Sequence, residues 1–380
     1  MAEVSYAKGL EGVIAAESRI CKVDGENGQL YYLGYPITEL VASCTFEEVT
    51  YLLLYGELPN RDQLAVFSAK MRNSRDLPEP VVAMVRDFPA SAHPMELLQS
   101  VISYVSSYVE HRIHHGPHCN CRDTLHQISE IATVVATYQR VRDGHDYLVP
   151  RRDLSHGANF LYLLRGEDPD ADEGEMMDKA LILHAEHGFN ASTFTARVVA
   201  STMSTCYCSM SAAIGALFGS LHGGANEKVM DMVDAIATRD NAKEWVNRAL
   251  DRKDKIMGMG HRVYRAKDPR AIVMEEYLQQ LSEKKQDFTY YEILKEVEHA
   301  FRERMEEKGK PIYPNVDFFS GAVYRLLGIP TILFTPIFAI SRASGWLSHI
   351  LEQRSDNRLF RPKALYTGSG PRSVVPIAER

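Results

Sequence analysis

With 380 residues, the chain is longer than one compact core usually holds, so we expect two domains or one large domain with a smaller excursion. Its net charge of −7 and its lack of a sustained basic stretch argue against a nucleic-acid partner. No apolar run is long enough to span a bilayer, and the first residues lack a signal or transit pattern, so we expect a cytoplasmic protein that does not enter membranes. The six cysteines are sparse, which favours reduced thiols over a disulfide framework.

The first predicted elements are two short strands at 18–23 and 29–33, which a glycine-bearing turn joins into a hairpin. After this hairpin the apolar pattern is helical almost throughout. Predicted helices begin at the capping sequences of Thr45 and Asn60, and another begins at Thr289. The apolar stripe of this last helix is Ile293, Leu294, Val297, Phe301 and Met305. The sequence therefore predicts an all-α protein with a short N-terminal β-hairpin.

Residues from about 190 to 218 are small or apolar, with Arg197 as the only charged side chain. Helices that are poor in charge on every side are buried, either in a central core or in an obligate subunit interface. We favour the interface, and therefore expect a homo-oligomer.

The charge-dense segment 234–255 follows these small-residue helices and indicates a change of domain. We predict that a small helical domain spans 221–320. The large helical domain would then comprise 1–220 plus 321–380.

Three segments of the sequence each place one titratable side chain beside glycine or proline: His222, His261 and Asp317. Such positions suit a side chain presented on a turn, where the backbone can lie close to a ligand. Two imidazoles and one carboxylate suit acid–base chemistry on a carbon acid next to a carbonyl. The pattern therefore predicts proton abstraction from a small acyl compound, with stabilisation of the oxyanion that results.

Each of these three residues also has a plainer interpretation. His222 is equally typical of a loop histidine near a helix start. The glycines around His261 resemble a phosphate loop, but the motif is incomplete and no strand precedes it, so we do not expect a nucleotide fold. Asp317 precedes two phenylalanines, which favours a desolvated and more basic carboxylate, although a helix cap would explain it as well.

Arginines at Arg270, Arg342 and Arg361 suit planar carboxylate groups. Arg342 borders an apolar helical stripe and needs an anionic partner, which a structural salt bridge would also supply. His187 lies near a predicted helix start, where an anion is favoured, although a structural histidine is the alternative. A local basic cluster suits phosphates or carboxylates, or is a solvated face; it contains Arg262, Arg265, Lys267 and Arg270.

Two segments resemble metal sites without matching their spacing. The histidine- and cysteine-rich segment from His111 to Cys121, with His126 after it, is dense enough to bind a soft metal ion. It fits no standard paired module, so we favour an exposed loop. The acidic segment 168–179 resembles a calcium loop, but its sixth position is not glycine and its twelfth is not glutamate, which excludes an EF-hand.

Taken together and in this order, the chemical segments resemble the signatures of the citrate synthase family. The resemblance runs from about Gly9 to Gly368, and its segments are specific only in combination; they are 221–226, 258–270, 315–321 and 361–368. The short N-terminal region is similar to the compact dimeric type. The resemblance implies an almost entirely helical homodimer, in which a large and a small domain close over oxaloacetate and then bind acetyl-CoA.

The resemblance also implies a role for each candidate residue. Asp317 would remove a methyl proton from acetyl-CoA, neutral His222 would hydrogen-bond to the thioester oxygen, and His261 would polarise the oxaloacetate ketone. The citryl thioester would then be hydrolysed to citrate and CoA. The implied oxaloacetate ligands are His187, Arg270, Arg342 and, donated by the partner subunit, Arg361. The implied CoA-binding residues are Met257, Gly258, Gly260, Arg262, Arg265 and Lys267. The resemblance implies no metal or redox cofactor, and acetyl-CoA enters as a substrate.

Two alternatives to citrate formation stay open at the level of sequence. One is 2-methylcitrate synthase, which uses propionyl-CoA with the same catalytic set, although the segment 315–321 looks more like the citrate-forming type. The other is a non-catalytic CoA- or metal-binding protein on the same fold, which the intact catalytic residues argue against.

Overall fold

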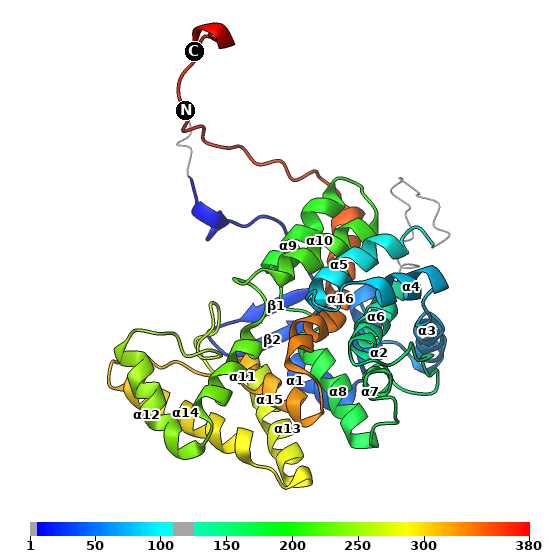
Figure 1. Cartoon of the computed structure of the whole chain (residues 1–380), viewed down its shortest axis with the longest axis vertical. Coiled ribbons are helices and arrows are strands. Elements are labelled where there is room, and N and C mark those ends of the chain that lie inside the picture. Colours follow the sequence, from blue (N-terminus) through cyan, green and yellow to red (C-terminus); the bar gives the residue numbers. More distant parts are fainter. Residues whose placement is uncertain (1–5, 109–124) are drawn as a thin grey trace.

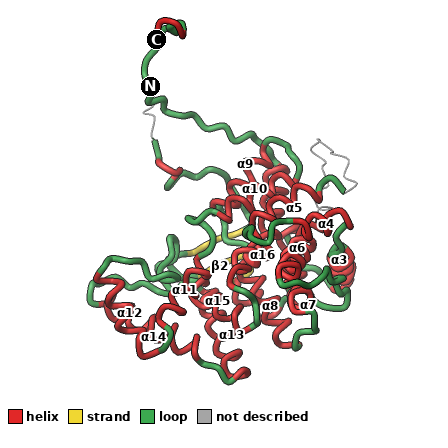
Figure 2. The backbone as a smooth tube through the Cα atoms, viewed as in Figure 1, coloured by secondary structure: helices red, strands yellow, loops and turns green. Residues whose placement is uncertain are grey.

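The computed structural model describes residues 6–108 and 125–380 and shows a mainly helical protein (Figure 1). A small antiparallel sheet lies near the N-terminus, in the order β1 (Cys21–Asp24), β2 (Gln29–Tyr32) and β3 (Tyr35–Pro36). The predicted hairpin is therefore confirmed, with a third short strand that the sequence pattern did not indicate. Figure 2 shows how small this sheet is beside the helices that surround it.

Helices α1 to α10 account for most of the chain before residue 220. Their bounds are α1 Ile37–Ser43, α2 Phe46–Tyr55, α3 Arg61–Asn73, α4 Glu79–Asp87, α5 Pro94–Val105, α6 His126–Arg142, α7 His156–Arg165, α8 Ala171–His184, α9 Ala191–Ser201 and α10 Cys206–Phe218. Complete capping boxes begin α2 at Thr45 and α3 at Asn60, as the sequence predicts.

Helices α11 to α15 lie together at one end of the molecule (Figure 1). Their bounds are α11 Ala225–Ile236, α12 Arg239–Asp251, α13 Pro269–Lys285, α14 Thr289–Glu306 and α15 Val316–Leu326. The predicted start of α14 at Thr289 is confirmed. Residue 320, the expected end of the small domain, lies inside α15, so a domain boundary would fall after the end of this helix; the division itself stays a prediction.

The long helix α16 (Phe334–Ser355) runs through the centre of the larger group of helices and packs against α2, α6, α8, α9 and α10. Most of its residues are buried, including the polar ones Arg342, Ser344, Ser348 and His349. A helix that is buried on every side must satisfy its polar groups within the protein. For this reason α16 carries several of the contacts that shape the site.

The small-residue helices α9 and α10 pack against each other, and also against α16 and α5. Part of their apolar surface therefore serves the core of the single chain. The subunit interface that we expect on these helices stays a prediction.

Three short 3-10 helices complete the described elements: Lys8–Leu10, Thr331–Leu333 and Ile377–Glu379. After α16 the C-terminal segment extends away from the helical body (Figure 1). Across the described ranges, every helix is too short or too polar to cross a membrane.

Candidate active site

A cavity of about 790 Å³ lies where the two groups of helices meet the N-terminal segment. Loops and helix starts that are far apart in the sequence supply its chemical side chains. Six predicted residues line it together: His187, His222, His261, Arg270, Asp317 and Arg342. Arg262 and Gly260 also line this cavity, so the tertiary structure assembles most of the predicted site.

His222 precedes α11, and the environment of its ring determines which nitrogen carries the proton. The Nε2 atom accepts a hydrogen bond from the backbone N–H of Ser192 at 3.2 Å and lies 2.8 Å from the Oγ atom of Ser192. The Oγ atom in turn accepts a hydrogen bond from Nε1 of Trp346 at 3.1 Å. Because Nε2 accepts, the neutral ring carries its proton on Nδ1. Burial, with a contribution from Arg342, lowers the pKa of His222 to about 4, so the ring is an uncharged donor at neutral pH.

His261 lies in the loop before α13 and has the opposite tautomer. Its Nδ1 atom accepts hydrogen bonds from the backbone N–H groups of Val263 and Tyr264, at 3.0 and 3.2 Å. The proton of the neutral ring is therefore on Nε2. Burial, followed by the charge of Arg270, lowers the pKa of His261 to about 4. This imidazole is also an uncharged hydrogen-bond donor.

Asp317 lies in the first turn of α15, and Asn315 is the residue that caps this helix. The Oδ1 atom of Asn315 accepts the backbone N–H of Asp317 at 2.9 Å, so the carboxylate of Asp317 is not used as a cap. Burial raises the pKa of Asp317 from 3.8 to about 6, although the charge of Arg270 opposes this shift. A partly desolvated carboxylate at the cavity wall is a stronger base than an exposed one.

The loop of His261 and the helix start of Asp317 are joined directly. The backbone N–H of Asn315 donates to the carbonyl of Gly258 at 2.9 Å, and its side-chain amide donates to the carbonyl of Gly260 at 2.8 Å. Gly258 has a φ of +77°, and a Cβ there would lie 2.8 Å from Cα of Phe318. Glycine is therefore required for this close approach, which places the imidazole and the carboxylate on one cavity.

The two buried arginines of the cavity differ in how many donors remain free. Asp268 holds the guanidinium of Arg270 through two bonds of 3.0 and 2.8 Å, and its Oδ2 atom also accepts the backbone N–H of Val316 at 3.3 Å. Arg342 donates from Nε to the carbonyl of His184 at 2.7 Å, whereas its Nη2 atom has no partner within the described part of the chain. A buried guanidinium with an open donor needs an anion.

Charge in the cavity is predominantly positive. Arg262, Arg270 and Arg342 line it, while Asp317 is the one carboxylate among the described lining residues. His187 adds a further polar group, because its Nε2 atom lies 3.2 Å from the hydroxyl of Tyr264. Burial, followed by the charge of Arg270, lowers the pKa of His187 well below its usual value. Such a cavity suits a small ligand with more than one carboxylate.

The structure places some predicted site residues elsewhere. Arg361 is exposed and lines a second cavity of about 1110 Å³, between the N-terminal segment and the chain after α16. Lys267 forms an ion pair of 2.5 Å with Glu275, so its charge is already balanced within the chain. Met257 and Arg265 do not line the first cavity. CoA binding by this group of residues stays a prediction.

The possible metal segment from His111 to Cys121 lies outside the described residues. In residues 6–108 and 125–380, no three histidine, cysteine or acidic side chains gather as metal ligands would. The acidic segment 168–179 contributes ion pairs instead: Asp168 pairs with Arg151, while Asp170 and Asp172 pair with Lys284.

Several residues that shape the site were missed at the level of sequence. Ser192, Trp346, Tyr264 and Asp268 orient the predicted groups but carry no motif of their own. The position of Asp268 immediately before Pro269 is a usual helix start, and this was the one local signal available. The contacts of Ser192 and Trp346 depend on segments that are distant in sequence, whereas Tyr264 contacts His261 within one loop whose conformation no motif indicates.

Comparison with known proteins agrees with this geometry. A family model described as "Citrate synthase, C-terminal domain" matches residues 9–363. Citrate synthase of Deinococcus radiodurans is 44% identical over 99% of each chain. The solved structure of citrate synthase from Thermoplasma acidophilum in ternary complex with carboxymethyl coenzyme A and oxaloacetate has a TM-score of 0.91 and 33% identity; the match covers 99% of this chain and 100% of that one.

A protein of Corynebacterium glutamicum named 2-methylcitrate synthase 1 is also similar, at 39% identity over 100% of each chain. Both activities therefore occur among full-length relatives. The match of the family model, the full-length identities and the shared fold lead to one conclusion: the chain belongs to the citrate synthase family.

Proposed function

We propose that this protein condenses acetyl-CoA with oxaloacetate and water to give citrate and CoA. The observation that carries this proposal is the convergence, on one positively charged cavity, of a basic carboxylate and two neutral imidazoles that keep an N–H free. Membership of the citrate synthase family and the name of the Deinococcus relative support the same reaction.

In the proposed first step, the carboxylate of Asp317 takes a proton from the methyl group of acetyl-CoA. The Nδ1–H of His222 donates a hydrogen bond to the thioester oxygen, where negative charge develops. Because the ring is already neutral, it stabilises an enol or enolate without first losing a proton. This assignment agrees with the tautomer that the Ser192 backbone imposes.

In the second step, the enol carbon attacks the ketone carbon of oxaloacetate and forms a carbon–carbon bond. The Nε2–H of His261 polarises the ketone oxygen and then protonates the new alkoxide. Water finally cleaves the thioester of citryl-CoA, which releases citrate and CoA. Each proton transfer has a donor or acceptor on the same cavity, as general acid–base catalysis requires.

Oxaloacetate would be bound by its two carboxylates. Arg270 and Arg342 supply guanidinium donors, and His187 supplies a further polar group. The Nη2 atom of Arg342, which has no hydrogen-bond partner within the described ranges, is the clearest candidate donor to a carboxylate oxygen. Arg361 would complete the set from the partner subunit of a homodimer, since it lies on an exposed segment outside the cavity of its own chain.

A second candidate is the use of propionyl-CoA to form 2-methylcitrate, which the names of similar proteins from Corynebacterium and Shewanella favour. One methyl group in a pocket is worth only about 1–3 kcal/mol, so the two substrates differ little in binding energy.

The deciding experiment measures the release of free CoA thiol with oxaloacetate and either acetyl-CoA or propionyl-CoA. Faster release from acetyl-CoA supports the proposal, and a clear preference for propionyl-CoA moves the assignment to 2-methylcitrate synthase. A folded protein that releases no thiol from either substrate would overturn both, and would favour a non-catalytic CoA- or metal-binding protein.

A further inference from the structure

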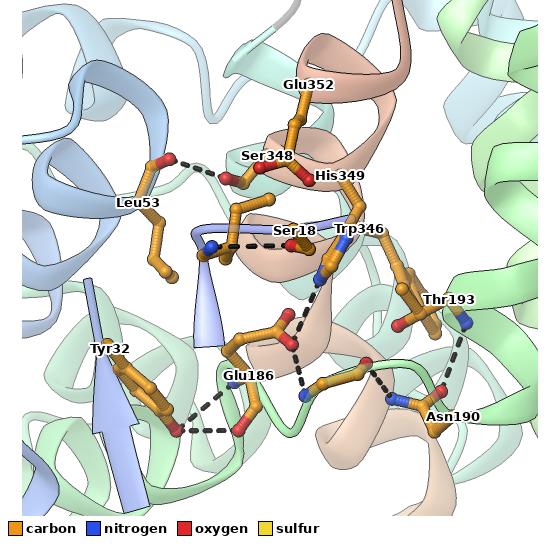
Figure 3. Close-up of polar contacts among 12 residues, drawn as sticks. Ser18, Tyr32, Leu53, Glu186, Asn190, Thr193, Trp346, Ser348, His349 and Glu352 are labelled. Atoms are coloured by element: carbon orange, nitrogen blue, oxygen red, sulfur yellow. Dashed lines mark hydrogen bonds and ion pairs between the residues drawn. The ribbon is translucent and has the colours of Figure 1, made fainter. Parts of the chain in front are cut away.

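A row of four side chains joined by hydrogen bonds lies outside the cavity and begins next to His187: Glu186, His349, Arg197 and Glu352. It begins at Glu186, which is fully buried and immediately precedes His187 in the turn between α8 and α9. Its Oε1 atom accepts the Nε2–H of His349 at 3.1 Å (Figure 3). His349 lies on α16 and is also fully buried. None of the proposed chemical steps uses this pair.

Glu186 holds the turn that carries His187. Its Oε1 atom accepts the backbone N–H of Gly188 at 2.5 Å, while its own backbone carbonyl accepts the hydroxyl of Tyr32 at 2.9 Å. These two bonds bracket His187 in the chain. A glycine at position 345 of α16 is also necessary here, because a Cβ would collide with the carboxylate of Glu186.

The charge of Glu186 also acts on Arg342. Burial lowers the pKa of Arg342, and the negative charge of Glu186 is the main opposing influence. Glu186 therefore influences two of the proposed oxaloacetate ligands, one through the backbone of its turn and one through its charge.

Arg197 determines the tautomer of His349. Its Nη1 atom donates to Nδ1 of His349 at 3.0 Å, so the proton of the neutral ring is on Nε2, facing Glu186. Arg197 does not line the oxaloacetate cavity. Its charge is balanced by Glu352 at 2.6 Å, and Glu352 accepts the backbone N–H of Arg19 at 2.9 Å.

Burying the charged members of this row, Glu186 and Arg197, costs free energy. A buried ion pair is often no more stabilising than apolar residues of the same volume, because desolvation offsets the attraction. This row lies next to the turn of His187, in spite of the free-energy cost of burying it. We therefore explain the row by its effect on the orientation of that turn, and not by a gain in stability.

We propose that His349 is a positioning residue for oxaloacetate: by donating its Nε2–H to Glu186, it fixes the turn that carries His187. Arg197 supports this role by holding the required tautomer. The inference rests on the proposed function, because it assigns the positioned groups to oxaloacetate.

The test compares two replacements of His349 that differ in the hydrogen bond they keep. His349→Gln retains an N–H donor near the place of Nε2, whereas His349→Asn retains an acceptor near the place of Nδ1 but cannot reach Glu186.

For His349→Asn, we expect the oxaloacetate KM to rise by roughly 10-fold to 100-fold, the ratio for a lost hydrogen bond to a charged group. The acetyl-CoA KM and kcat should change by less than about twofold. His349→Gln should restore most of the oxaloacetate KM.

Ser348→Ala is the matched control. The Oγ atom of Ser348 donates to the carbonyl of Leu53 at 2.5 Å, so this variant also removes a buried hydrogen bond of α16, but one that faces away from Glu186 (Figure 3). It should lower the unfolding temperature without changing the oxaloacetate KM. Equal oxaloacetate KM values for wild type and His349→Asn would overturn the inference, as would equal losses in the Gln and Asn variants.

Arg197→Met provides a second route if His349→Asn folds poorly. It removes the donor to Nδ1 without touching the cavity, so it should also raise the oxaloacetate KM, and its effect should be less than additive with that of His349→Asn. An unchanged oxaloacetate KM in Arg197→Met would contradict the proposed role of Arg197 in holding the tautomer of His349. If the wild-type protein itself releases no CoA thiol with oxaloacetate, the proposed function has failed instead, so the two failures are distinguishable.

Discussion

At the scale of single residues, the site depends on which protonation state each group adopts inside a partly closed cavity. Burial moves the pKa of Asp317 up to about 6 and the pKa of His222 and His261 down to about 4. At neutral pH the carboxylate is therefore charged and both imidazoles are neutral. In the proposed mechanism, this combination allows one base and two hydrogen-bond donors to act without a preceding proton exchange.

The pH dependence of the rate should reflect Asp317. We expect kcat/KM to fall as the pH decreases through about 6, because the protonated carboxyl cannot accept the methyl proton. The two histidines should not contribute to this limb, since they titrate near 4. A pH–rate profile for CoA thiol release tests this expectation. An acidic limb centred near 3.8, the ordinary value for aspartate, would contradict it.

Replacement of Asp317, the proposed base, should affect rate and stability in opposite directions. For Asp317→Asn, we expect kcat to fall by roughly 100-fold to 10,000-fold, the usual contribution of a general base. The folded pKa of Asp317 lies above the unfolded value, so the charged carboxylate costs stability at a pH above about 6. The variant should therefore be more stable than wild type at alkaline pH, by about 1–3 kcal/mol.

Chemical denaturation at two pH values checks the sign of this stability change. The advantage of Asp317→Asn should shrink as the pH falls from about 6 towards 3.8, because the folded wild-type protein then takes up the proton. A wild-type turnover rate in this variant would show that another group is the base.

At the scale of elements, helix caps connect local sequence to the geometry of the site. Asn315 caps α15 and also donates to the carbonyl of Gly260 in the His261 loop. Asn60 caps α3, at a distance from the cavity, through the same kind of bond to the backbone of Gln63. The two asparagines therefore form a natural pair for separating stability from activity.

We expect Asn315→Ala and Asn60→Ala each to lower the free energy of unfolding by about 1 kcal/mol, the usual value of an N-cap. Only Asn315→Ala should also lower kcat, because it releases the loop of His261 from the helix start of Asp317. Thermal unfolding and CoA thiol release measure the two effects. A loss of kcat in Asn60→Ala of similar size would mean that a general loosening of the fold explains both variants.

Much of the element scale could be predicted from the sequence. The capping boxes at Thr45 and Asn60, the start of α14 at Thr289 and the N-terminal hairpin are confirmed, because each depends on residues within a few positions of one another. The third strand was missed because β3 is two residues long and has no room for an alternating pattern. The helix start expected near His187 is confirmed as well, and Asn190 caps this helix, α9.

At the scale of the whole molecule, the segment after α16 is the part whose position is least explained by contacts within one chain. It extends from the helical body with most of its residues exposed, among them Arg361 (Figure 1). An exposed arginine on such a segment is well placed to reach a second subunit, which agrees with the proposed homodimer.

Mixing two impaired variants tests this arrangement. Arg361→Ala should weaken oxaloacetate use, and Asp317→Asn should lower kcat by roughly 100-fold to 10,000-fold. After subunit exchange, a mixed dimer would hold one site with both native residues, so roughly a quarter of the wild-type activity should return under random pairing. CoA thiol release before and after exchange measures this. No recovery, with mixed dimers demonstrated by mass, would mean that Arg361 serves its own subunit or no site at all.

The sequence by itself determined the helical class and the helix caps, because these depend on periodicity and on residues that are near one another in the chain. It also named the candidate acid–base residues, whose catalytic roles stay a proposal. The tertiary structure alone decided the tautomer of His222, the open donor of Arg342 and the contact of Glu186 with His349. The tautomer of His261 is set by backbone N–H groups two and three residues away, so it depends on the conformation of its own loop. Burial and hydrogen-bond partners set these properties, and most of the partners come from segments far apart in the chain. A linear pattern carries no information about which distant backbone N–H meets a given imidazole.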